Sequence, residues 1–220
     1  MDITLNEIEI RILACLIEKA YTTPDYYPLT LNALTNACNQ KSNRSPVLSL
    51  EETSVVRGLD ELRKKGLSEK ILKADSRVPK YKHLFTSKFD LSRSQTAVLC
   101  ELMLRGPQTL GEIRSRADRM NSFKDLGEVE EILSGLMTSD NPMVVKLPRR
   151  AGQKENRYMH LLSGEPVILE QDRQAADEPS TIQVQAENER IKKLEDQVTL
   201  LRNEFEALKK EFTDLKSEFE

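Results

Sequence analysis

The sequence predicts an α+β protein, mainly helical with small β-hairpins, and three observations support this prediction. An internal repeat places "KYKHLF" at residues 80–85 and "RYMHLL" at residues 157–162, so both histidines of the chain occupy equivalent positions. Helix-capping patterns precede apolar segments in both copies. A heptad pattern of apolar residues runs from Ile191 to Phe219. We therefore expect two small domains of the same kind, followed by a linker and a long terminal helix.

The repeat extends backwards from the two histidines, and its elements keep the same order in both copies. The offset between matching segments falls along the chain, so the first copy is the longer one. It carries seven extra residues around "YTTPDYYP" and five within "NACNQKSNRSPVLS". The matching segments are "ILACLIE" (12–18) with "VLCELML" (98–104), "TLNAL" (30–34) with "TLGEI" (109–113), and Val55, Leu59 and Leu62 with Val129, Leu133 and Leu136.

Three helices and one hairpin are expected in each copy. Residue pairs with the spacing of a capping box mark helix starts; these pairs are Asn6 with Glu9, Ser49 with Glu52, Ser92 with Gln95, Thr109 with Glu112, and Asp125 with Glu128. After the third helix, β-prone segments flank the polar tips "ADSRVP" and "PRRAGQKEN", which is typical of a hairpin. Three helices followed by a hairpin predict tandem winged helix-turn-helix domains, at residues 1–88 and 89–164.

The remainder of the chain predicts a linker and a coiled coil. Residues 165–183 are polar, acidic and interrupted by two prolines, whereas residues 184–220 repeat apolar side chains with 3,4 spacing. Glu204 with Lys209, and Glu211 with Lys216, would attract across a parallel pair. A parallel homo-oligomer is expected, either a homodimer or, because three Phe occupy a positions, a trimer. The alternative is an amphipathic helix that folds back onto the winged domains. The seam consists of Ile191, Leu194, Val198, Leu201, Phe205, Leu208, Phe212, Leu215 and Phe219.

Composition narrows the function classes. Of the 220 residues, 38% are hydrophobic, and the longest apolar run, residues 12–17, is far shorter than the ~20 residues of a membrane helix. The N-terminus has no basic segment followed by an apolar one, so we expect a cytoplasmic protein that does not contact the membrane. Cys15, Cys38 and Cys100 lie far apart without zinc-ligand spacing. Neither a metal nor a cofactor is predicted.

No pattern of catalytic residues is present in the sequence. It lacks a glycine-rich phosphate loop and a nucleophile elbow. Cys38 continues the apolar spacing of the second helix and is expected to be a small core residue. His83 and His160 recur at one position, which indicates a packing or hydrogen-bonding role. We therefore expect a non-enzymatic protein, with no small-molecule ligand evident.

The charge is distributed unevenly along the chain. The net charge of −3 combines +3 for residues 1–88, +1 for residues 89–164 and −7 for residues 165–220. Residues 41–88 carry 12 Lys and Arg against 6 Asp and Glu, a net charge of +6. An overall acidic protein can therefore still present a basic surface to an anionic partner such as duplex DNA.

Candidate nucleic-acid contacts lie at the entrance to the third helix, on that helix and in the two hairpins. The third helix of the second copy begins with carboxylates and no Lys or Arg, so we expect only the first copy to insert its helix into a groove. The candidates are Asn36, Asn39, Gln40, Lys41, Ser42, Asn43, Arg44, Arg57, Lys64, Arg77, Lys80, Lys82, Arg149, Arg150 and Lys154.

Two alternatives remain open for these residues. The amides, hydroxyls and guanidinium of residues 36–44 suit phosphates and base edges, but they suit helix caps and turns of their own chain equally well. The whole protein is either a DNA-binding regulator, or a scaffold whose winged domains bind proteins while the coiled coil sets the oligomeric state.

A family resemblance supports the fold prediction. The stretch "TTPDYYPLTLNALTNACNQKSNRSPVLSLEE", followed by "LDELRKKGL", closely resembles the YceH family of bacterial proteins, and the similarity extends through the second copy and the heptad tail. The resemblance implies a tandem winged-helix fold. It brings neither a known activity nor a set of functional residues.

Overall fold

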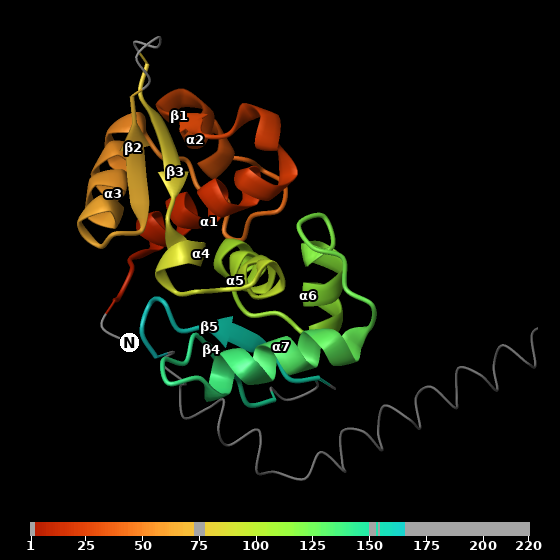
Figure 1. The fold of residues 1–220 in the computed structure, drawn as a ribbon. Coiled ribbons are helices and arrows are strands. Elements are labelled where there is room, and N and C mark those ends of the chain that lie inside the picture. Colours follow the sequence, from red (N-terminus) through yellow and green to blue (C-terminus); the bar gives the residue numbers. More distant parts are fainter. Residues whose placement is uncertain (1–2, 73–77, 150–152, 154, 166–220) are drawn as a thin grey trace, which may run out of the picture. The chain divides into compact units, whose positions relative to one another are not determined.

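The computed structural model describes residues 3–72, 78–149, 153 and 155–165, and these residues form seven α-helices, one 3₁₀ helix and two small antiparallel sheets (Figure 1). This confirms the α+β prediction. The predicted linker and coiled coil lie outside the described residues. The first half contains α1 (Glu7–Thr22), η1 (Pro24–Tyr26), β1 (Leu29–Thr30), α2 (Leu31–Cys38), α3 (Glu52–Lys64), β2 (Ser68–Ile71) and β3 (Lys80–His83).

The second half repeats the order of the main elements. It contains α4 (Phe85–Lys88), α5 (Arg93–Arg105), α6 (Leu110–Ala117), α7 (Leu126–Thr138), β4 (Val144–Lys146) and β5 (Tyr158–His160). The expected strand "KYKHLF" (80–85) is shorter in the structure, because β3 ends at His83. The short helix α4, which was not predicted, begins at Phe85. Residues 3–83 are called the first repeat, and residues 85–165 are called the second repeat.

The two sheets differ by one strand. In the first repeat the order is β1-β3-β2, with β1 pairing Leu29 opposite Tyr81, whereas β4 and β5 of the second repeat form a two-stranded ladder. A single bridge between Gln108 and Tyr158 stands where β1 pairs in the first repeat. The hairpin and its third contact are therefore present in both repeats, in a reduced form in the second.

Four of the five predicted helix caps form. Asn6, Ser92 and Thr109 each make a complete capping box, and Asp125 accepts a hydrogen bond from the backbone N–H of Glu128. The predicted cap at Ser49 is wrong, because α3 begins at Glu52 with Glu51 as its N-cap. The backbone N–H and C=O of Leu50 bond instead to the Asn39 side chain, at 2.7 and 2.8 Å, which keeps this segment in the preceding loop.

The core is continuous through both repeats, and α1 lies at its centre. Every residue of α1 from Glu9 to Glu18 is buried, because α2 and α3 cover part of this helix and α5 of the second repeat packs against it. The Cys100 thiol of α5 donates a hydrogen bond to the Ala14 carbonyl of α1 at 3.3 Å. Both repeats accordingly belong to one compact unit. No helix among the described residues is long and apolar enough to cross a membrane.

Candidate nucleic-acid interface and the buried ion network behind it

The structure separates the predicted nucleic-acid contacts by exposure. Residues at the surface are available to a phosphate, and buried ones are not. Asn36, Lys41, Ser42, Arg57, Lys64 and Arg149 are exposed, and Asn39, Gln40, Asn43, Lys80 and Lys82 are half-buried. Arg44 is buried, and Arg77, Arg150 and Lys154 lie outside the described residues.

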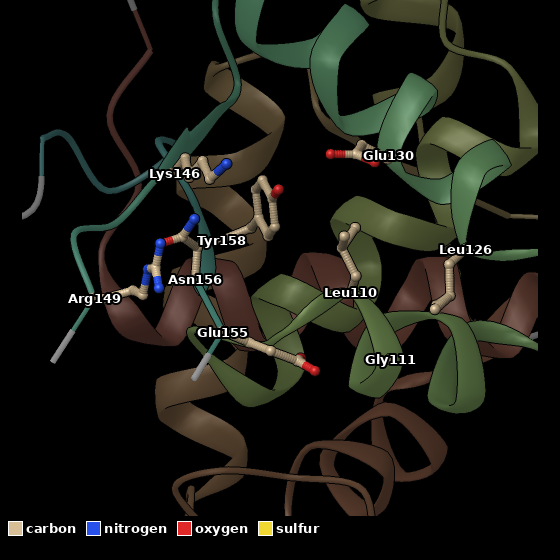
Figure 2. A pocket seen from close by; sticks show the side chains of 9 residues that line it. All are labelled: Leu110, Gly111, Leu126, Glu130, Lys146, Arg149, Glu155, Asn156 and Tyr158. Carbon is tan, nitrogen blue, oxygen red and sulfur yellow. The ribbon is translucent and has the colours of Figure 1, made fainter. Parts of the chain in front are cut away.

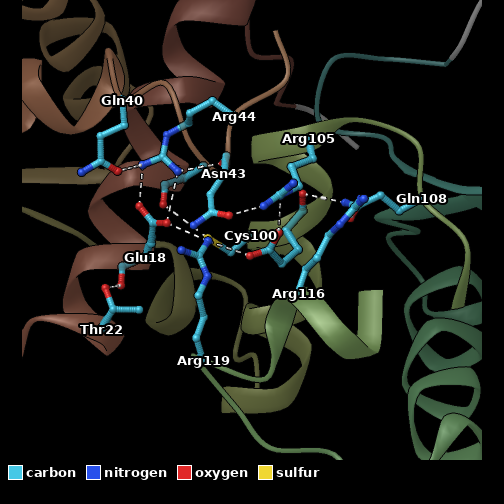
Figure 3. A network of polar contacts seen from close by, with 12 residues as sticks. Glu18, Thr22, Gln40, Asn43, Arg44, Cys100, Arg105, Gln108, Arg116 and Arg119 are labelled. Carbon is cyan, nitrogen blue, oxygen red and sulfur yellow. Dashed lines mark hydrogen bonds and ion pairs between the residues drawn. The ribbon is translucent and has the colours of Figure 1, made fainter. Parts of the chain in front are cut away.

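Arg44 is an internal residue, which corrects its prediction as a phosphate contact. Its guanidinium donates two hydrogen bonds to the Glu18 carboxylate, at 3.1 and 2.5 Å, and two more to the Ala37 carbonyl (Figure 3). Neither side chain of the Arg44–Glu18 pair is exposed. Bidentate Arg–carboxylate geometry of this kind fixes both partners. Arg44 therefore anchors the loop between α2 and α3, residues 39–51, to α1, and none of its donors is free to bind a phosphate. This loop contains the insertion of the first repeat and is called the inserted loop.

Other polar residues among positions 36–44 also form hydrogen bonds within the chain. Gln40 accepts a hydrogen bond from Arg44 at 3.0 Å, and Asn39 closes the loop through Leu50. The buried Arg11 of α1 donates to the carbonyls of Cys38 and Pro46, at 3.2 and 2.6 Å. Most of the hydrogen-bonding capacity that suggested a nucleic-acid contact is thus used by the chain itself, and of the candidates among residues 36–44 Asn36, Lys41 and Ser42 remain exposed.

The inserted loop also joins the two repeats. The Asn43 side chain accepts a hydrogen bond from Arg105 of α5, and the Ser45 N–H donates to the Leu104 carbonyl at 2.9 Å. Arg119, which follows α6, forms ion pairs with Glu18 at 2.7 Å and with Glu101 of α5 at 2.8 Å (Figure 3). Carboxylates from both repeats therefore share one guanidinium.

The pKa values of the two shared carboxylates are shifted in opposite directions. Burial raises the pKa of the Glu18 carboxyl, but the hydrogen bonds and charge of Arg44 and the charge of Arg119 outweigh it, so this pKa lies below its usual range. For Glu101, burial dominates and Arg119 offsets it only in part, so its pKa lies above the usual range. Glu18 is consequently the firmer anion of this network.

The cations that remain on the surface of the first repeat come from separate elements. Lys41 lies in the inserted loop, Arg57 on α3, Lys70 on β2 and Lys80 on β3, and none of them forms an ion pair with a described residue. Lys82, by contrast, pairs with Glu69 across the hairpin at 2.8 Å. Lys70 was not among the predicted contacts, because the prediction considered the second strand of the hairpin and not the first.

On α3 itself most charges are neutralised locally. Lys64 pairs with Glu61 at 2.7 Å, and Arg63 pairs with Asp60 at 3.1 Å. Arg57 is therefore the cation of α3 that a phosphate could reach without breaking a pair between described residues. In the second repeat, α7 contains no Lys or Arg, while Glu130 and Glu131 are exposed on it.

The two histidines occupy equivalent, paired positions, as the repeat predicts. His83 faces Ser68 in the β2–β3 ladder, and His160 faces Val144 in the β4–β5 ladder. The Nδ1 atom of each is buried with no hydrogen-bond partner among the described residues. Burial lowers the pKa of both to about 4, with Lys82 adding to the effect at His83. Such neutral interior imidazoles have a packing role, in agreement with the sequence prediction.

Fold and surface together define an α+β protein of two similar repeats that share one core and differ in the charge of α3 and α7. The chain belongs to a family described as "Protein of unknown function, DUF480", whose model matches residues 5–153. Among its relatives, UPF0502 proteins of Geobacter sulfurreducens and Geotalea uraniireducens are both 54% identical, the first over 91% and the second over 90% of each chain. A UPF0502 protein of Opitutus terrae is 46% identical over 90% of this chain and 83% of its own.

Proposed function

We propose that the two repeats are winged helix-turn-helix domains in tandem, which is the fold that the resemblance to the YceH family implies. We propose further that the first repeat binds duplex DNA and that the protein has a regulatory, non-enzymatic role. In this assignment α2 and α3 form the helix-turn-helix, and the β2–β3 hairpin is the wing. The corresponding elements of the second repeat are α6, α7 and the β4–β5 hairpin.

The observation that carries the proposal is the set of surface cations on the first repeat that pair with no described carboxylate. Lys41 precedes α3, Arg57 lies on it, and Lys70 and Lys80 lie on the adjoining hairpin. Cations held on the recognition helix and the wing are suited to neutralise phosphates on either side of a groove. Arg44 is excluded from this set because Glu18 holds it in the interior.

Salt dependence tests the phosphate contacts directly. Anisotropy titrations of the full chain with duplex DNA should give a log K that falls with log salt, with a slope of about −3 to −4 for four contacts. The triple variant Lys41→Ala, Arg57→Ala, Lys80→Ala should reduce this slope to about −1. Lys124→Ala, an exposed cation of the second repeat, is the matched control and should leave it unchanged.

The absence of binding at low salt, or binding without a salt slope, would exclude the proposed interface. The protein-scaffold alternative would then be preferred, and one observation favours it at the second repeat. There α7 exposes only carboxylates among its charged groups, and its first residue, Leu126, is 46% exposed. An acidic helix of this kind repels phosphates and suits a protein partner.

Self-association through residues 184–220 is part of the proposal. Deletion of residues 184–220 should convert an oligomer into a monomer in sedimentation experiments, because the heptad seam would then be missing. An oligomer that persists after the deletion would place the contact in the repeats instead.

A further inference from the structure

A pocket of about 370 Å³ opens in the second repeat between α6, α7 and the β4–β5 hairpin (Figure 2). Its apolar surface comes from three elements: Leu110 at the start of α6, Leu126 at the start of α7, and Tyr158 on β5. The volume lies within the range of small-molecule sites, near its lower end. Of the predicted DNA contacts Arg149 lines this pocket, whereas the four cations proposed to bind DNA on the first repeat, and the ion pairs of Glu18, do not.

The charged groups of the pocket are two carboxylates and two cations, and Glu130 is the one that comes from α7. Glu130 lies on the α7 side, whereas Lys146 and Arg149 lie on the hairpin side (Figure 2). Glu155, on the returning limb of the hairpin, supplies a second carboxylate. None of these four side chains forms an ion pair or hydrogen bond with another described residue, so each can engage a ligand without losing such a partner.

Tyr158, which contributes to the apolar surface of the pocket, is held in place by hydrogen bonds to Gln108. Tyr158 is 3% exposed, and its backbone exchanges hydrogen bonds with Gln108, at 2.8 and 3.1 Å. The Gln108 side chain in turn donates to the Glu101 carbonyl at 2.9 Å and accepts from Arg116 at 2.8 Å. The Lys146 ammonium lies 5.9 Å from the centre of the Tyr158 ring. This preformed wall reduces the ordering cost of binding.

From this arrangement we propose that the pocket binds a small zwitterion with an apolar side chain, of the chemical class of a free α-amino acid. Its carboxylate would face Lys146 and Arg149, its ammonium would face Glu130, and its side chain would cover Leu110, Leu126 and Tyr158. A ligand without net charge preserves the balance of two carboxylates and two cations, whereas an anion or a cation alone leaves one wall unmatched. The proposal is independent of DNA binding.

Calorimetric titration of the full chain tests the ligand class. L-Leucine or L-phenylalanine should bind saturably, with one molecule per chain, at concentrations up to about 10 mM. Two analogues of leucine serve as probes of each wall: 4-methylpentanoate lacks the ammonium and isoamylamine lacks the carboxylate. Each analogue should bind at least about tenfold more weakly than leucine.

Variants test the location of the site. Glu130→Gln and Lys146→Met should each weaken amino-acid binding by at least about tenfold, since the first removes the α7 carboxylate and the second removes one of the two hairpin cations. Glu131→Gln and Lys124→Met change exposed charges that do not line the pocket, so they should leave the affinity unchanged. The proposal is overturned if neither amino acid binds saturably, if the analogues bind as tightly, or if the pocket variants bind as the parent does.

Discussion

The two repeats have the same order of main elements, but the first contains inserted residues that form internal hydrogen bonds and ion pairs. The second repeat lacks these insertions. In the first repeat, the inserted segments bring Tyr27 to the His83 N–H, at 2.7 Å, and Arg44 to Glu18. The second repeat reaches across the interface with Arg119 and leaves a pocket beside its hairpin. The difference teaches that an insertion rich in polar residues can supply buried hydrogen bonds and ion pairs to the core of its own chain.

Breaking the anchor of the first repeat should have the largest effect. Arg44→Ala leaves Glu18 buried with only part of its compensation, and the free energy of unfolding should fall by about 3–5 kcal/mol. Chemical denaturation measures the change. Arg63→Ala removes a guanidinium from an exposed pair with Asp60 and should cost less than about 1 kcal/mol. Equal costs for the two variants would mean that the insertion is not an anchor.

Acid should distinguish the buried histidine of the second repeat from a non-titrating side chain. The pKa of His160 is lowered to about 4 by burial, and the unfolded value is about 6.5. The unfolded state therefore binds the proton first as pH falls. From pH 7 to pH 4, the stability of the parent relative to His160→Leu should decrease by about 3 kcal/mol. A stability difference between the two proteins that does not vary with pH would contradict the buried neutral imidazole.

Glycines on the two third helices should respond in opposite ways to alanine. A Cβ at Gly58 of α3 would lie 2.4 Å from Cδ1 of the fully buried Ile12 in α1, so Gly58→Ala should destabilise by about 1–3 kcal/mol. A Cβ at Gly135 of α7 meets nothing within 4 Å, so Gly135→Ala should stabilise by about 0.5–1 kcal/mol. Thermal unfolding compares the two. A stabilising Gly58→Ala would show that α1 and α3 can move apart.

The smallest effect concerns two predicted helix caps, of which the one at Thr109 forms and the one at Ser49 does not. Thr109→Ala removes the cap of α6 and should cost about 1 kcal/mol, as denaturant titration would show. Ser49→Ala should change stability by less than about 0.5 kcal/mol, because α3 begins at Glu52 without a side-chain cap. A cost at Ser49 similar to that at Thr109 would restore the predicted capping box.

Sequence reasoning succeeded where the physics is local. Asn6, Ser92 and Thr109 bond to residues three positions away, so spacing alone identified them. Ser49 failed although its spacing was correct, because Asn39, ten residues earlier, claims the adjoining backbone. A capping pattern predicts a cap only when no distant side chain competes for the same segment.

Long-range partners limited the prediction of the candidate site. Arg44 is compensated by Glu18, 26 residues earlier, and Glu18 also pairs with Arg119 of the other repeat. No periodic pattern links these positions, so an arginine in a polar run looked exposed. The pocket was missed for a similar reason, because α6, α7 and the hairpin each contribute only a few residues that are far apart in the sequence. The buried glutamate within the apolar run "ILACLIE" was the one signal that could have indicated an internal cation.

The position of α1 has a practical consequence for anyone who wishes to cut the chain in two. Helix α1 packs against both repeats: one side contacts α2 and α3 of the first repeat, and the other side contacts α5 of the second. A fragment that ends at residue 88 would expose the side that α5 covers, together with the Glu18 carboxylate deprived of Arg119. We expect such a fragment to aggregate, so the chain cannot be divided between its two repeats.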